Sequence, residues 1–189
     1  TSPYAEKVSN YLVEVYMNTR SYEAALKSIE RIAKPSAQIM EAKQKILFQL
    51  GTQSFANANF EQALQYLNQS IAIGQYNRQT KADAYYWCGE SYYRLNRMME
   101  AARDFNAYLQ LTTQPNNEMY ALANYNLGYI AFHRKDYTQA SNYFQKYIQL
   151  EKGENRTALA DAYNRIGDCH LNVRNFEEAK HYYSQAEQM

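Results

Sequence analysis

The stretch NLGYIAFHRKDYTQA, Asn126 to Ala140, decides the fold because its pattern returns 39 residues later as RIGDCHLNVRNFEEA, Arg165 to Ala179. Three more windows align with these two without a gap, and they begin at Tyr11, Gln49 and Trp87. Each window closes on an alanine, 38 or 39 residues after the previous one: Ala25, Ala63, Ala101, Ala140 and Ala179. Self-similarity at a fixed period is the signature of a repeat architecture. The sequence therefore predicts five copies of one structural unit.

Each unit is predicted to be a pair of antiparallel helices. In the fourth unit, Leu127, Ile130 and Ala131 follow helical spacing, and a second apolar stripe begins at Tyr137 after a polar turn. Short polar residues that can cap the second helix stand at one equivalent position: Ser21, Asn59, Asp136 and Asn175. The expected repeats span residues 4–34, 36–74, 77–113, 117–152 and 155–189. We expect a single array over residues 1–189, which is a fragment of a longer chain.

Glycine is scarce, with 6 residues in the chain, and its placement is informative. Four glycines share one repeat position, twelve residues before the recurring alanine: Gly51, Gly89, Gly128 and Gly167. We expect them to face that alanine and to let the two backbones of a hairpin approach closely. Gly74 and Gly153 follow second helices, where a left-handed cap costs glycine little. This distribution leaves no glycine for a phosphate-binding loop.

Composition and charge exclude several classes of function. Lys plus Arg is 20 and Asp plus Glu is 19, so the basic excess of a nucleic-acid-binding protein is missing. No apolar run approaches the roughly 20 residues that span a bilayer, so we expect no direct membrane insertion. His133, His170 and His181 lack the spacing of a zinc site, and no nucleophile–base pair is visible. We therefore predict no catalytic, cofactor or metal site, and a protein that is not an enzyme.

Cys88 and Cys169 lie two repeats apart, too far for a disulfide.

These residues resemble the tetratricopeptide repeat (TPR) family. The likeness rests on Leu127-Gly128, Ala131-Phe132, Tyr137, Ala140, Phe144 and the helix end at Leu150. It implies an all-α fold, a right-handed superhelical α-solenoid of about five helix-turn-helix repeats whose first helices line a concave groove. The period exceeds the family's usual length of about 34 residues. The stretch DAYYWCGESYYRL also resembles longer-period repeats of bacterial cell-envelope proteins, which favours a periplasmic or envelope-associated location over the cytoplasm.

The resemblance also implies which side chains face the groove, since the family places them at fixed positions around the glycine. In the first repeat this stripe reads Lys7, Asn10, Glu14 and Met17, and the middle repeats are aromatic there. The expected partner-binding residues are Phe48, Phe55, Tyr86, Glu90, Tyr93, Tyr125, Tyr129, Phe132 and Asp168. For Phe55, Tyr93 and Phe132, packing against a neighbouring helix is an equally good interpretation. Groove exposure is favoured for Tyr86, Tyr125 and Tyr129.

An aromatic groove of this kind is typical of a non-enzymatic scaffold that captures a protein or peptide segment. Acids outnumber lysines along the stripe, so apolar and basic peptides are the expected partners. Two alternatives remain open. The chain could be a structural spacer that self-associates through its uncapped last helix, Phe176 to Met189. Its Tyr-rich groove, with Trp87 beside it, could instead stack a carbohydrate.

Overall fold

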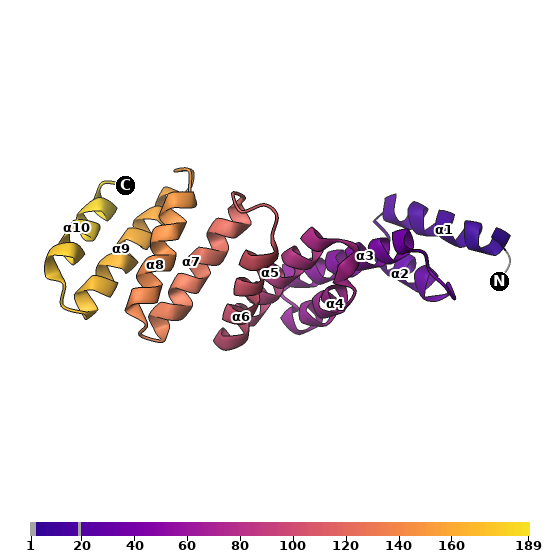
Figure 1. Ribbon diagram of the computed structural model, residues 1–189, viewed down its shortest axis with the longest axis horizontal. Helices are drawn as coiled ribbons and strands as arrows, with labels where there is room; N and C mark the ends of the chain where they lie inside the picture. Colours follow the sequence, from indigo (N-terminus) through magenta and orange to yellow (C-terminus); the bar gives the residue numbers. More distant parts are fainter. Residues whose placement is uncertain (1–2, 19) are drawn as a thin grey trace. The chain divides into compact units, whose positions relative to one another are not determined.

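The computed structural model describes residues 3–18 and 20–189, and all the regular structure in these ranges is helical (Figure 1). Contacts between Cα atoms divide the chain into two compact units, Thr1–Thr113 and Gln114–Met189. The boundary falls between the third and fourth expected repeats. A single array over all five repeats stays a prediction.

Unit 1 contains three helix pairs, one for each of the first three repeats. The pairs are α1 (Pro3–Asn18) with α2 (Tyr22–Glu30), α3 (Ala37–Ala56) with α4 (Phe60–Ala72), and α5 (Arg78–Arg94) with α6 (Met98–Leu111). A short 3₁₀ helix, η1 (Gly74–Tyr76), connects α4 to α5. Each pair packs together, and α2 and α4 also pack on the first helix of the next pair, α3 and α5 respectively.

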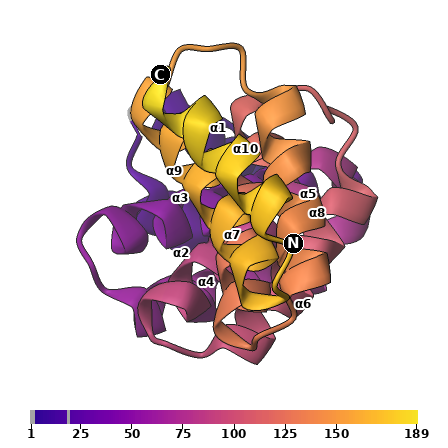
Figure 2. The same cartoon turned by 90° about the vertical axis from the view of Figure 1, so that its left-hand side faces the viewer.

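Unit 2 contains the last two repeats, built in the same way. The pairs are α7 (Glu118–His133) with α8 (Tyr137–Leu150), and α9 (Arg156–Asn172) with α10 (Phe176–Glu187). Helix α8 packs against both α7 and α9, and α10 packs against α9. Figure 2 shows α10 nearest the viewer in this unit. The all-α fold of TPR-like helix pairs that the repeat pattern predicts is confirmed.

The glycines of the first helices mainly accommodate large side chains of the second helices. A Cβ added at Gly128 would lie 2.8 Å from Cε1 of Phe144, and one at Gly167 would lie 2.7 Å from Cε1 of Tyr183. Gly51 and Gly89 meet Leu67 and Phe105 in the same way. Each partner lies four residues beyond the alanine, one helical turn along the second helix. The expectation that these glycines face the recurring alanine is therefore wrong for Gly89, Gly128 and Gly167, where an aromatic ring fills the space. At Gly51 it holds in part, since an added Cβ would also lie 3.4 Å from the backbone oxygen of Ala63.

The turn inside each hairpin uses a left-handed residue that is not glycine. These residues have φ between 59° and 64° and occupy one repeat position: Arg20, Ala58, Asn96, Lys135 and Arg174. Gly153 has φ of 84°, which confirms its left-handed conformation. The expectation of a left-handed helix cap is wrong for Gly74, which is the first residue of η1.

The expected helix caps are only partly formed. The side chain of Asn59 accepts a hydrogen bond from the backbone N–H of Gln62, and Asp136 accepts one from Gln139. Ser21 makes no such cap bond in α2, and neither does Asn175 in α10. The described first helices from α3 onward are capped as well, at Ser36, Asn77, Asn117 and Asn155.

Both cysteines, Cys88 and Cys169, are buried free thiols, as their positions two repeats apart predict. Within residues 3–18 and 20–189, no helix combines the length and the apolar character that a bilayer crossing requires.

Candidate functional site

In unit 1, the expected groove residue Tyr86 is buried in the hairpin between α5 and α6. Its ring packs edge-on against Trp87, Phe105 and Tyr108, with centroids 5.2, 5.7 and 5.4 Å away. Its hydroxyl donates to Oε1 of the half-buried Glu90 at 3.0 Å. With 3% of Tyr86 exposed, the prediction that it lines the groove is wrong. The aromatic rings of α6 explain this, because they form an apolar interior into which the ring fits. Burial also removes Tyr86 from any carbohydrate-stacking surface beside Trp87.

Phe55 connects two neighbouring repeats. Its ring lies 5.2 Å from Phe60 and 5.0 Å from Trp87, and the Arg94 guanidinium lies 5.6 Å above it. Of the two interpretations of Phe55, packing against neighbouring helices is therefore the one that the structure shows. Phe48 and Tyr93 are half-buried, and their part in binding stays a prediction.

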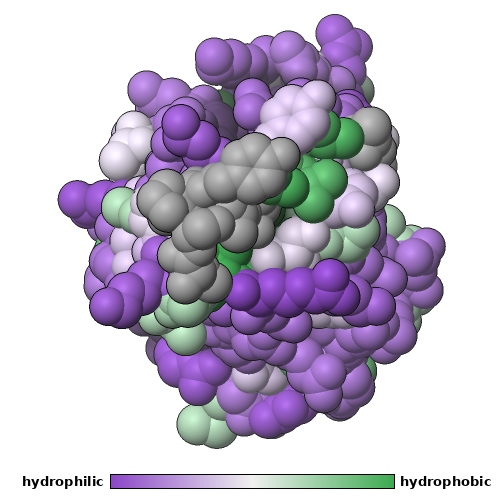
Figure 3. Space-filling view, turned by 90° about the vertical axis from the view of Figure 1, so that its right-hand side faces the viewer, coloured by the Kyte–Doolittle hydropathy of each residue, from purple (hydrophilic) through white to green (hydrophobic). Residues whose placement is uncertain are grey.

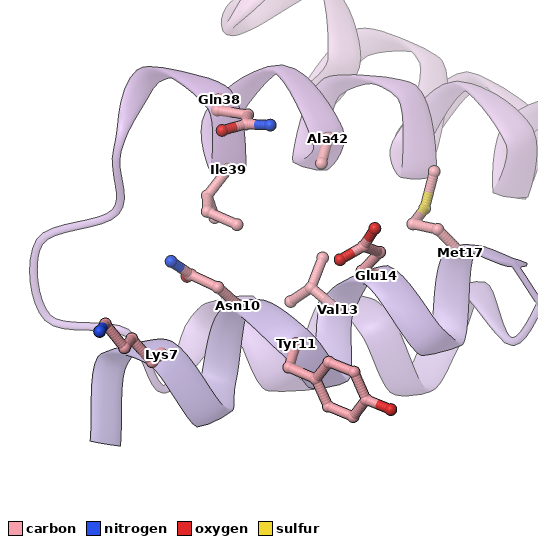
Figure 4. Close-up of a pocket in the computed structure, with 9 residues that line it drawn as sticks. All are labelled: Lys7, Asn10, Tyr11, Val13, Glu14, Met17, Gln38, Ile39 and Ala42. Atoms are coloured by element: carbon pink, nitrogen blue, oxygen red, sulfur yellow. The ribbon is translucent and has the colours of Figure 1, made fainter. Parts of the chain in front are cut away.

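A hollow of about 470 Å³ separates α1 from α3 in unit 1 (Figure 4). Its lining includes all four stripe residues of the first repeat: Lys7, Asn10, Glu14 and Met17. Ile39 and Val13 point into the gap from the two helices, whereas Tyr11 points away from α3. Viewed from the α1 side, Figure 3 shows hydrophobic residues at the surface among polar ones. Val8, Tyr11 and Leu12 are exposed apolar residues of α1. Lys7, Asn10 and Gln38 lie toward one end of the hollow and Met17 lies at the other, with Glu14 beside Val13 between them (Figure 4).

In unit 2, two expected groove residues meet a carboxylate of the next repeat. The hydroxyl of Tyr125 donates to Oδ2 of Asp161 at 2.5 Å, and the hydroxyl of Tyr129 donates to the same oxygen. The two rings lie 5.2 Å apart, and both pack on Phe144 of α8. Each ring is half-buried, so one side rests on the core and the hydroxyl points across to α9.

A second carboxylate extends this arrangement along α9. Tyr183 of α10 donates to Oδ1 of Asp168 at 2.5 Å. The Arg165 guanidinium lies between the two acids, with Nη1 3.3 Å from Oδ2 of Asp168 and Nε 3.7 Å from Oδ1 of Asp161. We call this set the phenol–carboxylate network, and its members are Tyr125, Tyr129, Asp161, Arg165, Asp168 and Tyr183.

The phenols of the network remain protonated donors well above neutral pH. Burial and the hydrogen bond to Asp161 raise the pKa of Tyr129 to about 12, and the same causes raise the pKa of Tyr125. Burial and the hydrogen bond to Asp168 raise the pKa of Tyr183 to about 12. The network therefore carries two carboxylates and one guanidinium, a formal charge of about −1 at neutral pH.

Phe132 is half-buried at the end of α7, with its ring 5.6 Å from Tyr137 of the same hairpin. Packing thus accounts for Phe132, whereas Tyr125, Tyr129 and Asp168 fall in one network. The list of expected binding residues lacked Arg165 and Tyr183. It also lacked Asp161, although Asp161 belongs to the same expected groove-facing stripe as Asp168. For Arg165 the signal was present, because a helix brings residues four before and three after it to the same face.

Comparison with known protein families shows which family the chain belongs to. Two models of the tetratricopeptide repeat match the chain, one over residues 48–118 and one over residues 118–189. The chain therefore belongs to the tetratricopeptide repeat family, which generally serves as a non-catalytic protein-interaction module. No curated protein matches the chain in sequence.

Several solved structures share the fold. MamA is 18% identical with a TM-score of 0.64, over 97% of this chain and 91% of MamA. BtubC (BKLC) from P. vanneervenii is 13% identical with a TM-score of 0.67, over 95% of this chain and 77% of BtubC. YrrB, a TPR protein with an unusual peptide-binding site, is 16% identical with a TM-score of 0.63, over 92% of this chain and 80% of YrrB. At these identities the likeness concerns the fold alone.

Proposed function

We propose that this protein-interaction scaffold captures a peptide segment on the surface that α7 and α9 form in unit 2, with Tyr125 and Tyr129 as the anchoring side chains. One observation carries the proposal: two phenols from α7 converge on a single carboxylate of α9. The network fixes both rings before any partner arrives, so binding costs less side-chain entropy. Rigid aromatic side chains are also the residues that most often dominate binding energy at interfaces.

The partner that best fits this surface is an extended or helical segment with apolar and basic residues. Apolar side chains would bury against the two half-exposed rings, and the residual negative charge of the network favours a cation nearby. The peptide-binding site of YrrB supports this use of the fold.

The test begins with a random dodecapeptide library displayed on phage and selected on the wild-type protein. Fluorescence polarisation then gives the Kd of the strongest peptide for Tyr129→Leu, which retains an apolar side chain, and for Tyr125→Ala combined with Tyr129→Ala. Because both rings pack on Phe144, the double alanine variant loses several kcal/mol of core packing. Its helicity and thermal midpoint are therefore measured alongside.

We expect Tyr129→Leu to weaken binding about tenfold, a loss of about 1.4 kcal/mol. The matched control is Tyr143→Leu, which changes a half-buried tyrosine of α8 to the same residue. It should alter the Kd less than about twofold, within the usual effect of a substitution outside an interface. An unchanged Kd in both Tyr129→Leu and the folded double variant would exclude this surface.

Self-association is a second candidate, because the α9–α10 turn exposes large apolar side chains. Leu171, Val173 and Phe176 are 46%, 58% and 60% exposed. A second copy that covered this patch would bury apolar area and stabilise a dimer. Sedimentation velocity on the wild type and on Phe176→Ser tests this: a concentration-dependent dimer that Phe176→Ser abolishes supports it, and a monomer at all concentrations contradicts it.

A further inference from the structure

Arg165 is held loosely between the two carboxylates of the network. Its Nη1 lies 3.3 Å from Oδ2 of Asp168, and its Nε lies 3.7 Å from Oδ1 of Asp161. A charge-assisted hydrogen bond between nitrogen and oxygen is shorter, at about 2.7–2.9 Å. The Nε of Arg165 is buried and makes no hydrogen bond. The Arg165 side chain is 32% exposed, so part of it already faces solvent.

The carboxylates themselves are held firmly, by phenols from other helices. Oδ2 of Asp161 accepts the hydroxyls of Tyr125 and Tyr129, which leaves Oδ1 directed toward Arg165. Oδ1 of Asp168 accepts the hydroxyl of Tyr183, which leaves Oδ2 directed toward Arg165. Phenols from α7 and α10 thus orient two carboxylate oxygens of α9 around one cation. The oxygens are better fixed than the cation that they surround.

We propose that Arg165 occupies the place of a ligand cation, and that a Lys or Arg side chain of a captured peptide displaces it and docks between Asp161 and Asp168. This inference rests on the proposed function, since the peptide must lie along α9 for its side chain to reach the acids. The displaced Arg165 extends into water, where a guanidinium is well solvated. A cation placed at 2.8 Å or so from each oxygen would gain stronger hydrogen bonds than Arg165 makes.

Arg165 consequently sets the selectivity of the surface. With the guanidinium in place, an apolar peptide binds beside the network without displacing anything. A basic peptide must break the two ion pairs of Arg165 first, which weakens its affinity relative to that of an apolar peptide. Removing the guanidinium should therefore lower the Kd of a basic peptide about tenfold relative to an apolar peptide, since these partly exposed ion pairs no longer have to be broken.

The test compares four proteins in parallel selections from the phage-displayed dodecapeptide library: the wild type, Arg165→Gln, Lys146→Gln, and Arg165→Gln combined with Asp168→Asn. Lys146 is an exposed residue of α8, so its substitution makes the same change in net charge away from the network. Calorimetry then compares the strongest peptide selected on Arg165→Gln with an analogue in which norleucine replaces one lysine. The ratio of the two Kd values measures recognition of the cation in each protein.

We expect Arg165→Gln to increase this ratio about tenfold over the wild type, Lys146→Gln to leave it unchanged, and Asp168→Asn added to Arg165→Gln to reduce it again. An equal ratio in the wild type and Arg165→Gln would overturn the inference and leave peptide capture standing. An equal increase in Lys146→Gln would also overturn it, as an effect of net charge. If no peptide binds any of these folded proteins, the proposed function fails, and the inference fails with it.

Discussion

The hydrogen bond from Tyr125 to Asp161 connects two repeats, and a double-mutant cycle can measure its strength. The cycle comprises Tyr125→Phe, Asp161→Asn and the two together. The bond is 2.5 Å long and ends on a carboxylate, and such charge-assisted bonds contribute about 1.5–3 kcal/mol. Because both side chains are half-buried, solvent screening lowers the expected coupling to about 1–2 kcal/mol.

Urea unfolding followed by circular dichroism gives the free energies of unfolding for this cycle. The single tryptophan, Trp87, lies in unit 1, so its fluorescence reports that unit separately. A matched control cycle comprises Tyr163→Phe, Asp161→Asn and the two together. Tyr163 lies two residues from Asp161 on α9, but its ring packs on Tyr182. That cycle should be additive within about 0.5 kcal/mol. A coupling below about 0.5 kcal/mol between Tyr125 and Asp161 would refute the claim that the network fixes the rings.

Further predictions concern packing and pH. Gly128→Ala should lower the stability of unit 2 by about 1–2 kcal/mol despite its better helix propensity, because the fully buried Phe144 cannot yield, and urea unfolding measures this. Gly167→Ala should cost less, since the half-exposed Tyr183 can move; an equal loss in both variants would contradict this explanation. The phenol of Tyr129 ionises near pH 10 when unfolded and near pH 12 when folded, so stability should fall as pH rises between these values. Tyr129→Phe should flatten that decline in unfolding experiments, and an unchanged slope would show that its ionisation is not linked to folding.

The repeat pattern was sufficient to predict the helix pairs, because every copy carries the same apolar spacing and the copies align without gaps. It could not determine how exposed the side chain at a given repeat position is in each copy. Tyr86 and Tyr125 occupy the same repeat position, yet Tyr86 is buried and Tyr125 reaches Asp161. The difference lies in their surroundings, since Glu90 accepts the hydroxyl of Tyr86 within its own helix.

The contacts of the network were harder to predict, because they join residues that are distant in sequence. Tyr125 and Asp161 are 36 residues apart, and their meeting depends on how α7 and α9 pack on α8. The register of a hairpin also decides that Gly128 faces Phe144 rather than the recurring Ala140. Arg165 is the exception, since helical spacing alone places it between Asp161 and Asp168.

The most direct measurement is an NMR titration of protein with labelled tyrosine rings by the strongest selected dodecapeptide. If the α7–α9 surface captures the peptide, the ring resonances of Tyr125 and Tyr129 shift in a saturable manner, while that of Tyr143 on α8 stays in place. Saturable binding that moves Tyr143 and leaves Tyr125 and Tyr129 unchanged would contradict the account.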